Sequence, residues 1–357
     1  MASRRRRPRS SAELGLRVQV HGSLHLKILV LAQYFRTSTD NWIDNACEDS
    51  RFKFTKAAYP FHNRSWHARG AVTPLVEWLQ LVRYANRALA REFDCVVTSF
   101  PQLALVVSLL SLIRLRRGTR IVAMNFNLGS VGNRYKGLLA GFVLRRVSRF
   151  AVHSSREIEE YSRWLNIPRE RFVFFPLQGA EVETNDPSVT LPDRFMAAMG
   201  SANRDYETLV KAHEGFDVPL VIVAKRDILD RLPDRANLIK LSNLTLQECN
   251  SIMARAIVNI VPLKDTKTAA GQVTFVTTMR LGLATIVTRC VGSSDYIEDG
   301  VTGIFVDPGD HETLRRKMTE LLEDDTLRDR ISSAAKTFAR DNLSDEAAAR
   351  NLVRLLS

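Results

Sequence analysis

Apolar runs alternate with segments of helical periodicity along most of the 357-residue chain. The runs are continuous rather than alternating, which is typical of strands buried on both faces. Such strands, each followed by a helix, predict a parallel sheet covered by helices. In the first half we expect strands at 25–35, 51–60, 94–99, 119–126, 149–155 and 171–177, and helices at 72–93, 101–116, 134–148 and 156–166.

The same alternation restarts after a polar, proline-containing segment at 178–193, which we interpret as a linker. The pattern therefore predicts an α/β fold of two doubly wound, Rossmann-like parallel-sheet domains that face a cleft. In the second half we expect strands at 194–200, 219–225, 236–241, 256–263 and 301–307, helices at 204–216 and 245–256, a loop, helix, turn and strand within 268–288, and three helices from 311 to 357.

These patterns divide the chain into five parts. Residues 1–22 form a basic tail that we expect to be disordered, because it contains too few apolar residues to fold. The first domain spans 23–177, the second domain spans 194–340, and the linker joins them. A final helix at 341–357 can return to the first domain.

Composition supports a globular protein, with 45% hydrophobic and 25% charged residues. The longest apolar run, 103–113, is far shorter than the ~20 residues that span a bilayer. No apolar segment follows the basic start, as a signal peptide would require. The four cysteines are scattered without a metal-binding spacing, which favours a reducing, cytoplasmic location.

The net charge of +12 is concentrated in one half of the chain. Residues 1–191 carry 29 Lys and Arg against 15 Asp and Glu, whereas residues 192–357 carry 22 against 24. Between Arg51 and Phe150 there are 17 basic and three acidic residues. This asymmetry indicates a negatively charged partner for the first half, either nucleic acid or an anionic membrane surface. A generally basic surface is the alternative.

The stretch "TAAGQVTFVTTMRLGLATIVT", 268–288, combines a glycine-containing loop with a helix and a buried strand. Backbone N–H groups and the helix dipole at such a helix start favour an anion. Gly271 lets the backbone approach a ligand closely. The stretch contains no acidic residue. An ordinary strand–helix turn is the alternative interpretation.

One family resemblance emerges from these residues. The segment "GQVTFVTTMRLGLATIVTRCVGSSDYIEDGVTGIFVDPGD", 271–310, resembles the carboxyl-terminal domain of family 4 retaining glycosyltransferases with the GT-B fold. "FMAAMGSANRDYETLVKA" is similar to the segment that opens that domain, and "AVHSSREIEEYSRWLNIPRERFVFFP" is similar to the end of the amino-terminal domain. The resemblance covers about residues 24–345.

The resemblance implies a metal-independent, hexosyltransferase-like enzyme without a cofactor. Such an enzyme moves a sugar from a UDP- or GDP-linked donor to a glycan or lipid-linked acceptor, with retention at the anomeric carbon. The second domain would bind the donor and the first domain the acceptor, in cell-envelope or exopolysaccharide synthesis. In the family, the glycine-containing turn faces the donor sugar and diphosphate; here that turn consists of Ala270, Gly271, Gln272, Val273 and Thr274.

The chain departs from the family at two acidic positions. The family usually has two glutamates eight positions apart, one near the sugar and one on the ribose. Here these positions are Ala269 and Thr277. Gln272, Thr274 and Thr277 could provide neutral contacts to sugar and ribose, although a charge-assisted hydrogen bond is roughly twice as strong. Thr274 and Thr277 could equally be ordinary helix positions.

Two basic residues are expected to bind the diphosphate. Arg204 falls at the position of the motif lysine, while Ser201 replaces the motif arginine. Lys225 ends an expected strand, at the edge where ligands of parallel sheets bind. With no DxD-like metal motif in the sequence, these cations would stabilise the leaving diphosphate. The alternatives are an ion pair of Arg204 with a neighbouring acid and a solvated Lys225.

In the first half, Asn125 and Asn127 lie where many family members carry a sugar-contacting histidine, and an amide can bind sugar hydroxyls. The loop after the first strand lacks the glycines usual in the family. His153 is interpreted as a packed or capping residue rather than a catalyst, because "HSSRE" has the form of a capping box.

The segments 112–120 and 134–149 are both basic and apolar. The resemblance implies docking of such helices on an anionic membrane, and thus a peripheral position on the inner face of the plasma membrane. A core-facing helix with a solvated basic edge is the alternative. Nucleic acid is disfavoured because no set of stacking aromatic residues is evident. The rival hypothesis is a non-catalytic GT-B protein; a dinucleotide oxidoreductase is disfavoured because no GxGxxG follows the first strand.

Overall fold

The computed structural model describes residues 25–35, 42–46, 48–61, 73–114, 118–129, 131–179, 182–184, 189–264 and 269–357. Several expectations lie outside these described residues. They are the basic tail 1–22, most of the loop after the first strand, Cys47, Thr268, and parts of the linker 178–193 and of the basic run 112–120.

The first domain is built on a six-stranded parallel sheet with the order β2-β1-β3-β4-β5-β6. Its central strands are buried along their length; Val97, for example, lies opposite Val122 in register. Burial on both faces explains the continuous apolar runs in the sequence. The strands are β1 (Leu26–Leu31), β2 (Phe52–Ala57), β3 (Cys95–Ser99), β4 (Arg120–Met124), β5 (Val147–Val152) and β6 (Phe172–Phe174).

Helices cover both faces of this sheet. On one face, Leu81, Val107 and Tyr161 pack in a single cluster with strand residues such as Val96 and Ile121. The helices of that face are α2 (Leu75–Ala88), α3 (Pro101–Arg114), α4 (Arg134–Leu144) and α5 (Ser155–Leu165), and the opposite face is covered by α1 (Ile43–Ala46) and α12 (Asp345–Leu356). A short 3₁₀ turn, Arg169–Arg171, precedes β6.

The second domain repeats the plan with the parallel order β12-β11-β10-β7-β8-β9. Its strands are β7 (Met196–Met199), β8 (Leu220–Val223), β9 (Leu238–Leu241), β10 (Val258–Val261), β11 (Thr285–Thr288) and β12 (Ile304–Val306). Its helices are α6 (Tyr206–Ala212), α7 (Arg226–Leu229), α8 (Leu246–Arg255), α9 (Gln272–Leu281), α10 (His311–Glu323) and α11 (Asp325–Asn342). Residues of α6 and α10 pack on one face, and residues of α8, α9 and α11 pack on the other.

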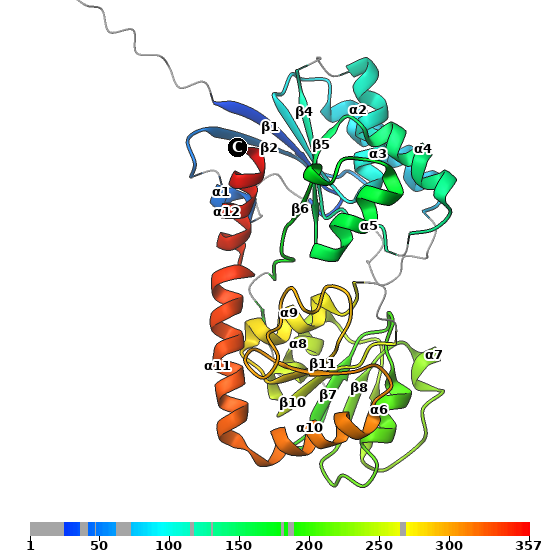
Figure 1. Ribbon diagram of the computed structural model, residues 1–357, viewed down its shortest axis with the longest axis vertical. Helices are drawn as coiled ribbons and strands as arrows, with labels where there is room; N and C mark the ends of the chain where they lie inside the picture. Colours follow the sequence, from blue (N-terminus) through cyan, green and yellow to red (C-terminus); the bar gives the residue numbers. More distant parts are fainter. Residues whose placement is uncertain are drawn as a thin grey trace, which may run out of the picture.

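The two domains are stacked, and the chain crosses between them twice (Figure 1). The second crossing is made by α11, which runs along the second domain, and by α12, which lies on the first sheet beside α1. Leu352 of α12 packs with Ile28 and Val30 of β1. The predicted α/β fold of two Rossmann-like domains is therefore confirmed.

Strand order reverses once in each sheet of such a fold. Ligands bind at that reversal, beyond the carboxyl ends of the strands. In the second sheet the reversal lies between β7 and β10, since β8 and β9 continue on one side and β11 and β12 on the other. The loops that leave this point begin at Gly200 and Pro262. They contain Arg204 and lead to the start of α9.

Candidate functional site

The carboxyl ends of the two sheets face each other through direct contacts. The carbonyl oxygen of His153, just after β5, accepts hydrogen bonds from Gln272 Nε2 at 2.8 Å and from the Tyr296 hydroxyl at 2.8 Å. The Tyr296 hydroxyl in turn accepts from the Leu177 N–H at 2.9 Å. The start of α9 therefore lies directly against the β5–α5 loop of the first domain.

A carboxylate of the second domain lies at the amino-terminal end of α5. Asp295 accepts from the Ser154 hydroxyl at 3.0 Å, the Ser155 N–H at 2.9 Å and the Ser155 hydroxyl at 2.5 Å. An anion at a helix start is favourable by roughly 0.3–1 kcal/mol. The sequence analysis did not single out this residue, and the only available sign was the acidic position within "VGSSDYIEDG".

The predicted capping of α5 is present in part. The Ser154 side chain accepts from the Arg156 N–H at 3.3 Å. Glu157 turns back to accept from the His153 N–H at 3.1 Å and also accepts from the Tyr161 hydroxyl at 2.8 Å. Burial raises the pKa of Glu157 to about 7. The cap thus fixes the backbone that receives Gln272 and Tyr296.

Arg204 is folded back under the loop that follows β7. Its guanidinium donates to Met199 O at 3.0 Å, Ala202 O at 2.7 Å and Thr274 Oγ1 at 2.9 Å, and only 9% of the residue is exposed. Gly200 makes this approach possible, since a Cβ there would lie 2.6 Å from Arg204 Nη2 and φ is +112°. The side chain is held against the first turn of α9.

This buried cation has no carboxylate partner in the described part of the chain. The alternative ion pair with a neighbouring acid is not formed there: Asp205 caps α6 by accepting from the Thr208 N–H, and Glu207 lies 3.6 Å from Lys264. Burial of the guanidinium lowers the pKa of Arg204. A buried charge without a counter-ion is costly, and the guanidinium retains N–H groups beyond the three in use. A bound anion would offset the buried charge and accept hydrogen bonds from these N–H groups.

The start of α9 provides further donors at the same place. Gly271 is the N-cap, with φ +77°, and a Cβ there would lie 3.0 Å from Val261 Cγ1. Helix geometry leaves the first N–H groups, those of Gln272, Val273 and Thr274, without acceptors inside the helix. The first turn has no acidic residue. Beside Arg204, and at the strand-order reversal, the unpaired N–H groups of this turn favour a negatively charged ligand.

Lys225 lies at the next strand end. Its N–H donates to Ser201 Oγ at 2.9 Å, which joins the loop after β8 to the loop that carries Arg204. The side chain is exposed. No hydrogen bond or ion pair of its ammonium group is found within the described residues. The structure thus brings Arg204, Lys225 and the α9 start to one edge of the second sheet.

The two positions that are acidic in the family lack any charge. The Thr277 hydroxyl donates to Val273 O at 2.8 Å, which leaves its oxygen able to accept from a ligand. Ala269 packs against Gly292, where an added Cβ would lie 3.3 Å from the Ala269 Cβ. Ala270 is half-buried beside Cys290, and its carbonyl accepts from Cys290 Sγ at 3.8 Å. Sugar or ribose contacts here can only be neutral.

In the first domain, Asn125 belongs to a polar cluster at the ends of β3, β4 and β5. Its Nδ2 lies 2.7 Å from Ser99 Oγ, and its Oδ1 lies 3.1 Å from His153 Nε2. His153 donates from Nδ1 to Phe175 O at 2.9 Å, and burial lowers its pKa. A neutral ring that donates from Nδ1 must accept at Nε2, which favours the amide orientation with the Asn125 nitrogen towards the ring. His153 is packed, with both ring nitrogens engaged.

Two further residues of the first domain differ from expectation. Tyr34, which the sequence analysis did not select, brings its hydroxyl to Ser99 and Asn125, and burial of that hydroxyl raises its pKa although 37% of the residue is exposed. Asn127 instead accepts from the Gly129 N–H at 2.7 Å in a local turn. Among the described residues, no hydrogen bond joins its side chain to Arg204 or to α9.

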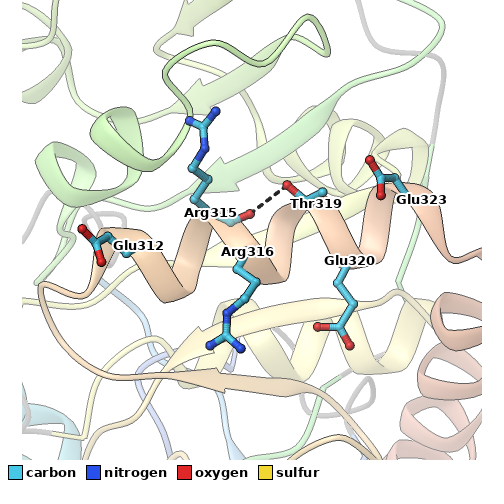
Figure 2. Close-up of a pocket in the computed structure, with 6 residues that line it drawn as sticks. All are labelled: Glu312, Arg315, Arg316, Thr319, Glu320 and Glu323. Carbon is cyan, nitrogen blue, oxygen red and sulfur yellow. Dashed lines mark hydrogen bonds between the residues drawn. The ribbon is translucent and has the colours of Figure 1, made fainter.

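A hollow of about 500 Å³ lies on the outer side of α10, away from these residues. Figure 2 shows its side chains spreading in different directions from one exposed helix. Acidic and basic groups are mixed there, and Arg315 donates to Ala212 O at 3.2 Å. Figure 1 places α10 at the end of the second domain opposite the first domain, so the hollow is separate from the candidate site.

Comparison with solved structures defines the class of fold. HepE from Anabaena in complex with UDP is 14% identical, with 93% of this chain and 99% of that chain covered and a TM-score of 0.67. HepE in complex with UDP-glucose is 15% identical, with the same coverage and a TM-score of 0.66. Sucrose-phosphate synthase from Thermosynechococcus elongatus is 13% identical, with 93% and 98% covered and a TM-score of 0.70. The chain has the GT-B fold.

A family model matches most of the second domain. Residues 203–324 match the model of group 1 glycosyl transferases, a segment that begins at the Arg204 loop and ends after α10. No curated protein matches the chain significantly. Among the described residues, no helix combines the length and hydrophobicity needed to cross a membrane, and no three His, Cys, Asp or Glu residues are grouped as metal ligands.

Proposed function

We propose that this protein is a glycosyltransferase that moves a sugar from a UDP- or GDP-linked donor to an acceptor. The observation that carries the proposal is the buried Arg204, which lacks a carboxylate partner in the described chain and lies at the start of α9. The group 1 glycosyl transferase match over the same domain supports it. The presence of UDP and UDP-glucose in structures of the HepE neighbour supports a nucleotide-sugar donor.

In the proposed mechanism the second domain binds the donor diphosphate. Arg204, the first N–H groups of α9 and the exposed ammonium of Lys225 surround it with positive charge. When the bond between the anomeric carbon and the diphosphate oxygen breaks, negative charge grows on the leaving group. Fixed donors aimed at that charge lower the barrier without a metal ion. The acceptor oxygen forms the new bond to carbon as its hydroxyl proton passes to an oxygen of the departing diphosphate.

Neutral side chains complete the donor site. Thr277 would accept a hydrogen bond from a ribose hydroxyl. Thr274 and the amide oxygen of Gln272 would contact the sugar. Asn125 contacts the ring of His153, whose carbonyl accepts from Gln272, and this link supports a contact of the Asn125 amide with the sugar. Asn127 would contact the sugar or the acceptor only from the edge of the proposed donor site. Neutral pairs are weaker than charged ones, and we expect modest donor affinity.

The acceptor binds the basic first domain, as a glycan or a lipid-linked glycan. Cell-envelope or exopolysaccharide synthesis and retention of configuration at the anomeric carbon follow from the resemblance to family 4 enzymes. NMR of the product formed from a donor of known anomeric configuration tests the stereochemistry. An inverted product contradicts it.

Donor turnover tests the function itself. We would measure sugar release and transfer with UDP- and GDP-sugars for the wild type, Arg204→Met and Lys225→Ala. Arg226→Ala is a matched control, because this neighbouring cation is exposed and pairs with Asp230. The proposal predicts turnover with at least one donor, loss with Arg204→Met, a smaller decrease with Lys225→Ala, and no change with the control.

A second candidate is a non-catalytic GT-B protein that binds a nucleotide, a sugar or a partner protein. The observation that favours it is the absence of any carboxylate at Ala269 and Thr277. Thermal-shift binding of UDP or GDP without turnover of any donor would establish this candidate over the first. Measurable transfer would exclude it.

A further inference from the structure

Phe100 joins β3 to α3 in a backbone conformation that is rare for an aromatic residue. Its φ is +72°, in the left-handed region, where a bulky side chain is an outlier. Because α3 begins at Pro101, Phe100 is the whole connection between strand and helix. Glycine would adopt this conformation without a steric penalty. An aromatic side chain at such a position indicates that the ring has a role which offsets the backbone strain.

Phe100 also lies at the strand-order reversal of the first sheet. The order β2-β1-β3 shows that the chain continues to β2 on one side of β1 and to β3 on the other. The loops that follow β1 and β3 therefore border the place where ligands of such sheets bind. The loop after β1 contains Tyr34, and the rings of Tyr34 and Phe100 lie 6.2 Å apart at 89°.

The Tyr34 side chain is held at its hydroxyl end and exposed along its ring. The hydroxyl is hydrogen-bonded to Ser99, Asn125 and Trp42. Since 37% of the residue is nevertheless exposed, the exposed part of the side chain is ring carbon. Phe100 is half-buried. We name Tyr34 and Phe100 the aromatic pair.

The chemistry around the aromatic pair matches a carbohydrate. A pyranose has an apolar face of C–H groups, which packs on aromatic carbon, and hydroxyls around its edge. A few polar groups beside an apolar surface fix the orientation of such a ligand. Asn125 is half-buried next to the Tyr34 hydroxyl, and its amide offers two donors and two acceptor sites, while three side chains contact it. A nucleobase could also stack here, but the cations for its diphosphate lie on the second domain.

The aromatic pair lies at the edge of the first sheet that faces the proposed donor site. Asn125 Oδ1 lies 3.1 Å from the His153 ring, and the His153 carbonyl accepts from Gln272 of α9. We propose that the aromatic pair is a subsite for the terminal pyranose of the acceptor and determines which acceptor is used. The role as acceptor subsite rests on the proposed glycosyl transfer, whereas binding of a pyranose does not.

Saturation-transfer NMR of the full chain with methyl pyranosides tests the subsite without a donor. We expect saturation of the ring C–H protons of at least one of the gluco, galacto and manno compounds, and less for acyclic sorbitol. Phe100→Gly removes the ring and relieves the strain. It should therefore weaken binding about tenfold or more while the melting temperature is retained. Tyr34→Leu should weaken binding similarly, and Tyr34→Phe, which keeps the ring, should not.

A matched control separates the subsite from aromatic surface in general. Phe142 on α4 is 66% exposed, and Phe142→Ala should leave pyranoside binding unchanged. The proposal is overturned by no saturation of any pyranoside, by an equal loss with Phe142→Ala, or by unchanged binding in Phe100→Gly or Tyr34→Leu. Saturation of uridine or guanosine bases that Phe100→Gly abolishes would overturn it in favour of a nucleobase site.

Acceptor kinetics distinguish failure of the subsite from failure of the proposed function. With an active donor, Phe100→Gly should raise the acceptor KM about tenfold and leave the donor KM within about twofold. Turnover with an unchanged acceptor KM in this variant would remove the subsite and leave the function intact. Pyranoside binding that depends on the aromatic pair, without turnover of any donor, would support the subsite and contradict the function.

Discussion

Arg204→Met is the substitution that tests the proposed diphosphate site most strongly. Methionine preserves much of the aliphatic volume but removes the charge and the three hydrogen bonds to Met199, Ala202 and Thr274. The change in side-chain volume is therefore small, and most of the effect is electrostatic. A nucleotide whose diphosphate contacts Arg204 should lose affinity, whereas the same nucleoside without phosphate should not.

The expected loss of nucleotide affinity follows from the number of guanidinium N–H groups that are not used inside the protein. Three of the five N–H groups of the guanidinium are used inside the protein, which leaves two for the proposed phosphate. A hydrogen bond to a charged group contributes about 1.5–3 kcal/mol. Two such bonds amount to about 3–6 kcal/mol, or roughly 10²- to 10⁴-fold in the dissociation constant. We expect the lower end of that range, because the α9 N–H groups and Lys225 still act on the diphosphate.

Isothermal titration calorimetry with UDP and uridine, and with GDP and guanosine, measures this effect. The expected result is a loss of about 100-fold or more for the diphosphate and less than about threefold for the nucleoside. Arg204→Lys, which keeps the charge but loses the fork of donors, should lie between the wild type and Arg204→Met. An equal loss for nucleoside and diphosphate, or no loss for either, would refute the role assigned to Arg204. Urea unfolding checks that the variant is folded.

Three further outcomes are expected. Lys225→Ala should weaken UDP binding only about three- to fivefold, and the difference should disappear at high salt because the side chain is exposed; a larger, salt-independent loss contradicts this assignment. Tyr296→Phe removes the hydroxyl that donates to His153 O and accepts from the Leu177 N–H, and should lower the free energy of unfolding by about 1–3 kcal/mol in urea titration; unchanged stability would show that this contact does not hold the domains together. Glu157 has its pKa raised from 4.5 to about 7, so the folded chain retains a proton that the unfolded chain has lost. Its stabilising effect is complete below pH 4.5 and declines by up to about 3 kcal/mol as the pH rises through 7. Glu157→Gln should flatten this decline in urea titrations across that range, and identical pH profiles for both proteins would contradict it.

Much of the fold could be predicted because strands buried on both faces have a strong sequence signature. The run from Ile121 to Ala123 is fully buried, and the apolar Val96 and Val97 of β3 lie opposite Ile121 and Val122. Element ends were less predictable. The helix expected from residue 204 begins at Tyr206, because Arg204 pairs with Leu263 in an isolated bridge and Asp205 is the N-cap. Four-residue helices such as α1 and α7 are too short to show a period.

The candidate site could be predicted only where its signals are local. Two signals can be recognised within a few neighbouring residues. They are the glycine before a helix, Gly271, and the basic residue after a strand, Lys225. The contact of Asp295 with Ser155 joins residues 140 apart, and that of Gln272 with His153 joins residues 119 apart. Spacing carries no information on such pairs, since they depend on how the two folded domains meet.

A crystal structure of the chain with UDP or GDP, whichever binds, tests the central claim most directly. We expect diphosphate oxygens within hydrogen-bond distance of the Arg204 guanidinium and of the first N–H groups of α9, with Lys225 turned towards them. A nucleotide bound elsewhere, with Arg204 still enclosed by its three protein acceptors and no phosphate beside Gly271, would contradict it.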